Sequence, residues 1–167
     1  MVWARTKLTI WDDLFEPVEK FITNYSGKNP EKFYKKVKEL MVDVFKIPKE
    51  RCQEKRYTHE KKGKSGKFKY SWELTKILDN YTYIRADIDL EGEYEGDEGK
   101  ATIVFEPVLI TEYPQDSVLE QNILYEVLRR VWHKTFYHKK RMKYIEFGRK
   151  LSTEFDTKLK TFARELE

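Results

Sequence analysis

The chain has 167 residues, with 33 Lys and Arg against 29 Asp and Glu, and a formal net charge of +4. Hydrophobic residues at 40% and aromatic residues at 15% exclude an intrinsically disordered chain, although charged residues reach 37%. No apolar run approaches the roughly 18 residues that a transmembrane helix needs, so we expect a single soluble domain over residues 1–167 and no membrane span.

The first residues and the cysteine count indicate a compartment. The N-terminus lacks the apolar core of a secretory signal, and the single Cys52 excludes an internal disulfide. We therefore expect a cytoplasmic protein. The sequence is poor in Asn and Gln and rich in Lys and Glu, a composition that suits a thermophilic protein.

The N-terminal region predicts a strand and a helix. Apolar and polar residues alternate over residues 2–11, which is the period of a half-buried strand. Asp13 and Glu16 then form a capping-box pair, and apolar residues follow at helical spacing as far as Tyr25. We expect a helix over residues 13–25.

Two further segments show helical spacing. Pro30 occupies the first position of a helix that ends before Pro48. Near the C-terminus, Ser117 and Glu120 form a second capping box, and an apolar stripe continues to the end of the chain with a break among residues 137–141. A long C-terminal helical region is predicted.

Between these helices, residues 51–113 change to a period of two. Breaks at residues 63–66, 79–80 and 96–99 divide the segment into four strands, which predicts an antiparallel meander. Aligning the apolar faces across a loop at residues 78–80 sets Trp72 opposite Ala86. On the other face this register sets Lys69 opposite Asp89 and Glu73 opposite Arg85, so that opposite charges meet.

The predicted fold class is therefore α+β, with an antiparallel sheet packed against helices. The order of strand, two helices, meander and long C-terminal helical region resembles the helix-grip arrangement of START-like and Bet v 1-like proteins. That resemblance implies a curved sheet wrapped around the C-terminal helix and an apolar cavity between them. The sequence predicts five strands, where the helix-grip fold has seven.

The sequence carries no motif typical of catalysis, cofactor binding or metal binding. The segment Gly63-Lys64-Ser65 lacks the first glycine of a phosphate-binding loop and precedes a strand, so it predicts a basic hairpin turn. His59, His133 and His138 lack the spacing of a metal-ligand set, and Cys52 is interpreted as a core thiol. We expect no cofactor and no metal, and a protein that is more readily a binding module than an enzyme.

An acidic stretch over residues 87–98 carries seven negative charges and no positive one. We interpret it as a solvated strand face with a polar hairpin tip. An alternative is an acid and base pair, because Asp89 lies opposite Glu106 if residues 96–99 form a four-residue loop.

A basic stretch interleaved with aromatic residues has three interpretations. It is a solvated helix surface, an intramolecular partner of the acidic strand, or, together with the lysines of the hairpin at residues 61–69, a nucleic-acid-binding surface. Its residues are Arg129, Arg130, Lys134, Lys139, Lys140, Arg141 and Lys143.

Two function hypotheses follow. The first is a small-molecule or lipid-binding module without catalytic activity, with an apolar ligand in a cavity lined by Tyr70, Trp72, Ile84, Ile88, Phe105 and Trp132. The second is a nucleic-acid-binding protein that uses the basic stretch. Because Trp72 and Trp132 both lie within apolar stripes, we expect both to be buried on facing elements; the sequence does not specify the ligand or the oligomeric state.

Overall fold

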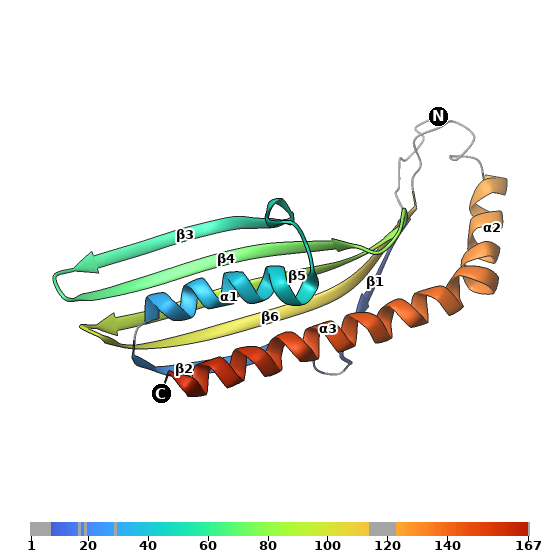
Figure 1. The fold of residues 1–167 in the computed structure, drawn as a ribbon. Coiled ribbons are helices and arrows are strands. Elements are labelled where there is room, and N and C mark those ends of the chain that lie inside the picture. The colour runs from blue at the N-terminus through green and yellow to red at the C-terminus, as the bar shows by residue number, and fades with distance from the viewer. Residues whose placement is uncertain (1–7, 17, 19, 29, 114–122, 167) are drawn as a thin grey trace, which may run out of the picture.

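The structure is a computed structural model that describes residues 8–16, 18, 20–28, 30–113 and 123–166. It confirms the predicted α+β class, with a sheet, an N-terminal helix and a long C-terminal helix (Figure 1). In chain order the elements are β1 (Leu8–Asp13), β2 (Phe21–Lys28), α1 (Pro30–Phe45), the 3-10 helix η1 (Lys49–Arg51), β3 (Cys52–Lys62), β4 (Ser65–Ile77), β5 (Thr82–Glu95), β6 (Glu98–Tyr113), α2 (Ile123–Trp132), the π-helix η2 (His133–Tyr137) and α3 (His138–Glu165).

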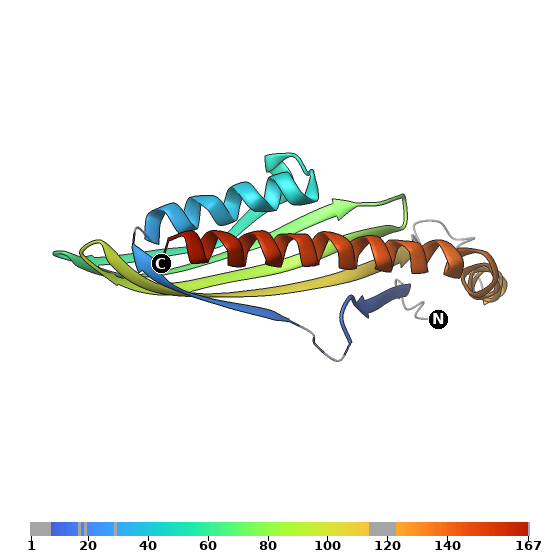
Figure 2. The same ribbon diagram turned by 60° about the horizontal axis from the view of Figure 1, so that its bottom comes forward.

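Six antiparallel strands form one sheet in the order β1-β6-β5-β4-β3, and β2 also pairs with β6. The sixteen-residue strand β6 holds both N-terminal strands, with Leu8 of β1 opposite Tyr113 and Phe21 of β2 opposite Phe105. Strands β3 to β6 form the meander expected from the sequence. The sheet is long and curved, and α1 and α3 lie side by side along one of its faces (Figures 1 and 2).

The core fills the space between the two helices and the apolar face of the sheet. At its centre, the Phe105 ring of β6 lies 4.8 Å from the Phe155 ring of α3 and 6.2 Å from the Phe45 ring of α1, measured between ring centroids. Full burial of a side chain of this size contributes about 1.5 to 3 kcal/mol to stability. The helix predicted to begin at Pro30 and end before Pro48 is confirmed as α1.

The C-terminal region stays helical from Ile123 to Glu165, and its axis bends between α2 and α3 (Figure 1). The π-helix η2 lies at this bend, where the wider turn changes the direction in which following side chains point. The predicted capping box at Ser117 lies outside the described residues. Within the described part of the chain, no helix is long and apolar enough to cross a membrane.

The helix predicted over residues 13–25 is wrong, because this segment contains the ends of two strands. β1 continues to Asp13, and β2 begins at Phe21. In β2 the side chains alternate, with Tyr25 buried in the core and Ile22 exposed. Pairing with β6 and the burial of alternate side chains in the core favour the strand over the locally predicted helix.

The predicted pairing of β4 with β5 is also wrong, by two residues. Trp72 lies opposite Ile88, not Ala86, and Lys69 lies opposite Glu91, not Asp89. An even shift keeps each side chain on its predicted face, so the core face is correct although the partners are not. The loop between the strands is two residues longer than predicted, since Ile77 pairs with Tyr83 and the five residues 78–82 make the turn.

The hairpin of β5 and β6 is tighter than predicted. Glu95 pairs with Glu98, so the turn has two residues, and Gly96 adopts the left-handed conformation with φ 63°. Asp89 consequently lies opposite Val104, not Glu106, and the proposed acid and base pair is not formed.

Candidate ligand-binding site

The structure brings together five of the six residues predicted to line a cavity. Tyr70, Trp72, Ile84, Ile88 and Phe105 are all buried on the helix-facing side of the sheet, where they belong to the packed core. Trp132 lies apart from them, and 52% of its surface is exposed. The expectation of burial is therefore confirmed for Trp72 and wrong for Trp132, because α2 turns its apolar residues away from the sheet.

A pocket of about 200 Å³ lies on the same side of the sheet, between the first turns of α1 and strands β3, β4 and β5. We call it the aromatic pocket. Five of its residues are aromatic or imidazole rings supplied by the three strands, and Tyr34 of α1 adds a sixth. Its lining consists of Pro30, Tyr34, Lys35, Tyr57, His59, Phe68, Tyr70 and Tyr94.

Strand register explains why the rings gather here. Tyr57 pairs with Tyr70 and His59 pairs with Phe68, so two rings of β3 and two of β4 share one face. The Tyr70 ring is central, with its centroid 4.8 Å from that of Tyr57 and 4.4 Å from that of Tyr34. Rings at these separations attract each other by more than area burial alone, by about 0.5 to 1.5 kcal/mol per pair.

Two glycines make room for the rings. Gly92 lies opposite Phe68, and Gly66 lies opposite Tyr94. A Cβ atom added to Gly92 would collide with the Phe68 ring, and one added to Gly66 would lie 2.6 Å from the Tyr94 ring. Each glycine therefore lets a neighbouring ring lie flat across the strand, which is a positional role of glycine in a sheet.

Polar groups stand among the rings. The Nε2 atom of His59 lies 2.8 Å from the Tyr94 hydroxyl, and its Nδ1 atom lies 3.3 Å from the Tyr70 hydroxyl. A neutral imidazole has one donor and one acceptor nitrogen, so one tyrosine donates to His59 and the other accepts from it. Burial, reinforced by the neighbouring tyrosine hydroxyls, raises the pKa of Tyr70.

Glu54 holds the lining residue Tyr34 and the neighbouring Trp72 in position. Its Oε2 atom accepts weak hydrogen bonds from the Tyr34 hydroxyl at 3.5 Å and the Trp72 indole N–H at 3.4 Å. Lys38 of α1 pairs with the same oxygen at 3.5 Å. Glu54 lies where β3 has a bulge, which turns its carboxylate toward α1.

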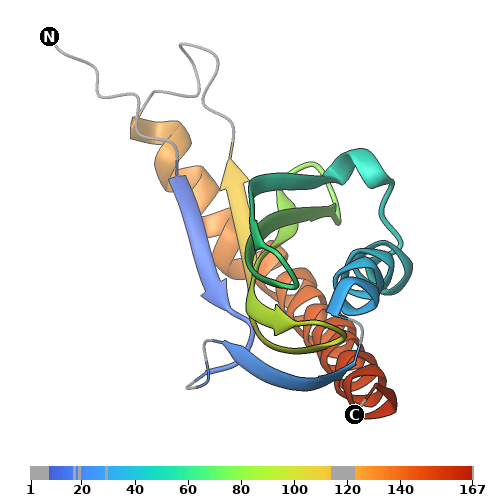
Figure 3. The ribbon, with the colours of Figure 1, turned by 90° about the vertical axis from the view of Figure 1, so that its left-hand side faces the viewer.

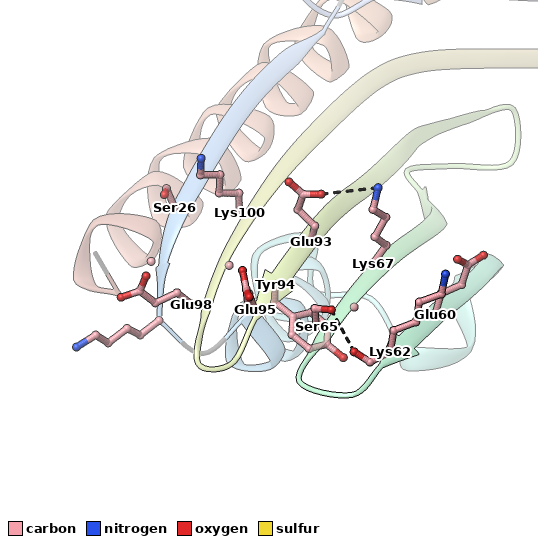
Figure 4. A pocket seen from close by; sticks show the side chains of 14 residues that line it. Ser26, Glu60, Lys62, Ser65, Lys67, Glu93, Tyr94, Glu95, Glu98 and Lys100 are labelled. Atoms are coloured by element: carbon pink, nitrogen blue, oxygen red, sulfur yellow. Dashed lines mark hydrogen bonds and ion pairs between the residues drawn. The ribbon is translucent and has the colours of Figure 1, made fainter.

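A second, larger hollow lies at the tips of the hairpins, on strands β2 to β6 (Figure 4). It is lined by four glutamates and four lysines, so no sign of charge prevails. Lys67 pairs with Glu93 at 3.9 Å, and Lys69 pairs with Glu91. Two of the five lysines of the predicted basic hairpin thus pair with the acidic strand beside them. The described residues contain no group of three or more His, Cys, Asp or Glu that could hold a metal ion.

Three of the seven residues in the predicted basic stretch are engaged within the fold. Arg141 is buried and pairs with Asp12 of β1, Lys140 pairs with Asp79 at 2.7 Å, and the buried Arg129 lies near Glu126. The interpretation in which the acidic strand neutralises the charge of this basic stretch is wrong. The acidic partners of the basic stretch lie on β1, on α2 and in the β4–β5 loop. The other four residues are exposed: Arg130, Lys134, Lys139 and Lys143.

A buried polar row joins the C-terminal helical region to the sheet, and sequence reasoning missed it. Arg129, His133, Tyr137 and Arg141 recur at intervals of four residues and face β6; we call them the polar row. Tyr113 of β6 lies beneath it, with its hydroxyl 2.7 Å from Nδ1 of His133. The four-residue spacing was the available signal.

One chain of hydroxyls runs through the polar row. The Tyr137 hydroxyl donates to Asp79 at 2.9 Å, so it accepts from Thr82 at 2.5 Å, and Thr82 in turn accepts from Thr111 at 3.0 Å. Burial lowers the pKa of His133, and the nearby Arg141 lowers it further. The hydroxyls of this chain and Asp79 are satisfied by each other, which suits a structural joint. The Nε and Nη1 atoms of the buried Arg129 have no hydrogen-bond partner among the described residues.

No protein-family model matches the chain, and no curated protein matches it. The assignment of function therefore depends on the geometry of these sites.

Proposed function

We propose that the protein is a small-molecule-binding module whose site is the aromatic pocket. The observation that carries this proposal is the concentration of rings around one opening, with polar atoms of His59 and Tyr94 between them. Pockets of this kind, apolar with a few placed polar groups, are typical binding sites.

The size of the pocket restricts the ligand. A cavity of about 150 Å³ accommodates benzene, so about 200 Å³ suits a molecule of one or two rings. Tyr57 lies at the pocket with 58% of its surface exposed, leaving a ring face open for stacking. The phenol and imidazole groups favour a planar ligand with hydrogen-bonding atoms at its edge.

The test is ligand-observed NMR with indole and adenine as first probes, followed by a set of one- and two-ring heterocycles. We expect the Tyr57→Ser and His59→Ala variants to weaken binding by about tenfold each, because each removes a stacking or polar contact. Tyr125→Ser is the matched control, since Tyr125 is also exposed but lies on α2. Binding that persists unchanged in both pocket variants, or no binding by any probe, would refute the proposal.

A further inference from the structure

Helix α2 is attached to the sheet by its polar side. Arg129 is 5% exposed, its guanidinium carbon lies 5.7 Å from the centroids of the Tyr113 and Tyr125 rings, and His133 contacts the Tyr113 hydroxyl. The apolar residues of α2 and η2 point elsewhere. More than half of the surface is exposed in each of Val127 (55%), Leu128 (59%), Val131 (55%), Trp132 (52%) and Phe136 (63%).

These five residues form one continuous surface, which we call the apolar stripe. Val127 and Val131 are one turn apart, as are Leu128 and Trp132, and the Trp132 and Phe136 rings lie 5.1 Å apart. Single exposed apolar residues need no explanation, but a contiguous patch marks an interaction surface. Figure 1 shows α2 at one end of the molecule, and in Figure 3, which views the molecule from the opposite end, α2 lies behind β1 and β6.

Positive charge lies beside the apolar stripe. Residues 127–145 contain seven Lys and Arg and no Asp or Glu. Four of the seven are exposed, and within the described residues none of these four forms an ion pair. Lys134 follows Val131 by three positions and Arg130 by four, so the cations Arg130 and Lys134 run along one margin of the stripe.

Three occupants can be compared. A second copy of the chain would bring the two sets of cations toward each other, at an electrostatic cost. A single-stranded nucleic acid would engage the cations and could stack on Trp132 and Phe136, but it would leave the aliphatic Val127 and Leu128 without an apolar partner. An anionic lipid surface satisfies both features, because acyl chains cover apolar side chains while headgroups pair with Lys and Arg.

We propose that the apolar stripe binds the surface of an anionic membrane. Helix α2 and η2 lie in the plane of the interface, with the stripe inserted and Arg130 and Lys134 directed to the headgroups. The polar row then has a second role, because it fixes the helix to the sheet by polar contacts and leaves the apolar side available.

The experiment is flotation of the full chain with vesicles of phosphatidylcholine alone or mixed with phosphatidylglycerol. We expect binding to the mixed vesicles that weakens with added salt. Val131→Ser combined with Phe136→Ser should weaken it by about tenfold or more per side chain. The matched control is Val18→Ser combined with Ile22→Ser, which removes equally exposed apolar residues (55% and 53%) elsewhere and should leave binding unchanged.

The charge contribution is tested separately. Arg130→Gln combined with Lys134→Gln should weaken binding roughly 25-fold, since each basic residue near an anionic surface adds roughly fivefold. Lys61→Gln combined with Lys64→Gln, in the exposed β3–β4 hairpin, is the control.

Vesicle binding that is absent at low salt, or that is insensitive to the stripe variants, overturns the proposal. The proposal is also overturned if the chain forms a dimer that the Val131→Ser, Phe136→Ser variant no longer forms. Binding to oligonucleotides instead of vesicles overturns it as well. None of these results bears on ligand binding in the aromatic pocket.

Discussion

Replacing Asp79 by Asn tests the joint between the C-terminal helical region and the sheet. The carboxylate of Asp79, in the β4–β5 loop, accepts hydrogen bonds from Lys140 at 2.7 Å and from the hydroxyls of Tyr137 at 2.9 Å and Tyr144 at 3.1 Å. It also accepts from two backbone amides of its own loop at 2.8 and 2.9 Å. The side chain of Asp79 is only 17% exposed, so little of this interaction is lost to solvent screening.

The magnitude follows from the pKa of Asp79. Burial alone would raise it, but the hydrogen bonds from Lys140, Tyr137 and the loop amides outweigh burial and lower the pKa from 3.8 to about 2. At 1.36 kcal/mol per unit, ionised Asp79 stabilises the fold by about 2 kcal/mol. Because the folded-state pKa is the lower one, this stability is present above about pH 4 and is lost as the pH falls toward 2.

The assay is urea unfolding of the wild type and Asp79→Asn at neutral pH and at several values between pH 5 and 2. We expect the variant to be less stable by about 2 kcal/mol at neutral pH and the difference to shrink toward zero near pH 2. Asp97→Asn, at the exposed tip of the β5–β6 hairpin, is the control. A difference that does not change with pH would show that the Asp79 charge does not hold the joint.

Three further predictions can be checked by the same unfolding measurements. Trp72→Ala should cost about 3 to 5 kcal/mol because Trp72 is 1% exposed, whereas Trp132→Ala should cost less than about 1 kcal/mol because half of its surface is already exposed; similar losses would contradict the different burial. Gly92→Ala should destabilise by about 1 to 3 kcal/mol, since its Cβ collides with the Lys100 backbone carbonyl as well as with Phe68, and a Phe68→Leu change in the same chain should recover only the part due to the ring. Burial raises the pKa of Tyr113 to about 12, so stability should fall as the pH rises from 10 to 12, and Tyr113→Phe should reduce that fall; an unchanged pH profile would contradict it.

The meander and α1 were predictable because their patterns are long and agree with burial. Alternation over residues 51–113 and the apolar face of α1 each point to one structure, and tertiary contacts support that choice. Residues 13–25 were not predictable in this way, since their apolar spacing fits a helix and, from Phe21 onward, also a strand. The β-branched and aromatic residues of β2, and Pro17 within the predicted helix, were the signals that favoured a strand.

The predicted register of β4 and β5 was wrong because it took only these two strands into account. The predicted register sets Glu73 opposite Arg85, but the observed one sets it opposite Asp87. Lys55 of β3 lies beside both carboxylates, 2.5 Å from Glu73 and 3.2 Å from Asp87. A third strand thus supplies the countercharge, and the pairwise rule of opposite charges does not apply.

The burial predicted for Trp132 failed because an amphipathic pattern does not say which side of a helix meets the protein. In α2 the polar row contacts Tyr113 and the apolar stripe does not. The aromatic pocket was missed for a related reason. Tyr57, His59 and Phe68 are spread over two strands, and only the register of β3 with β4 brings them together.

The pairing of both N-terminal strands with β6 has a consequence for the order of folding. Leu8 and Tyr113 are about 100 residues apart in sequence, and within the described sheet β1 and β2 pair with β6, so neither can pair before β6 is present. During synthesis β1 and β2 leave the ribosome long before β6 exists. Both strands therefore remain without their sheet partner until β6 has been made.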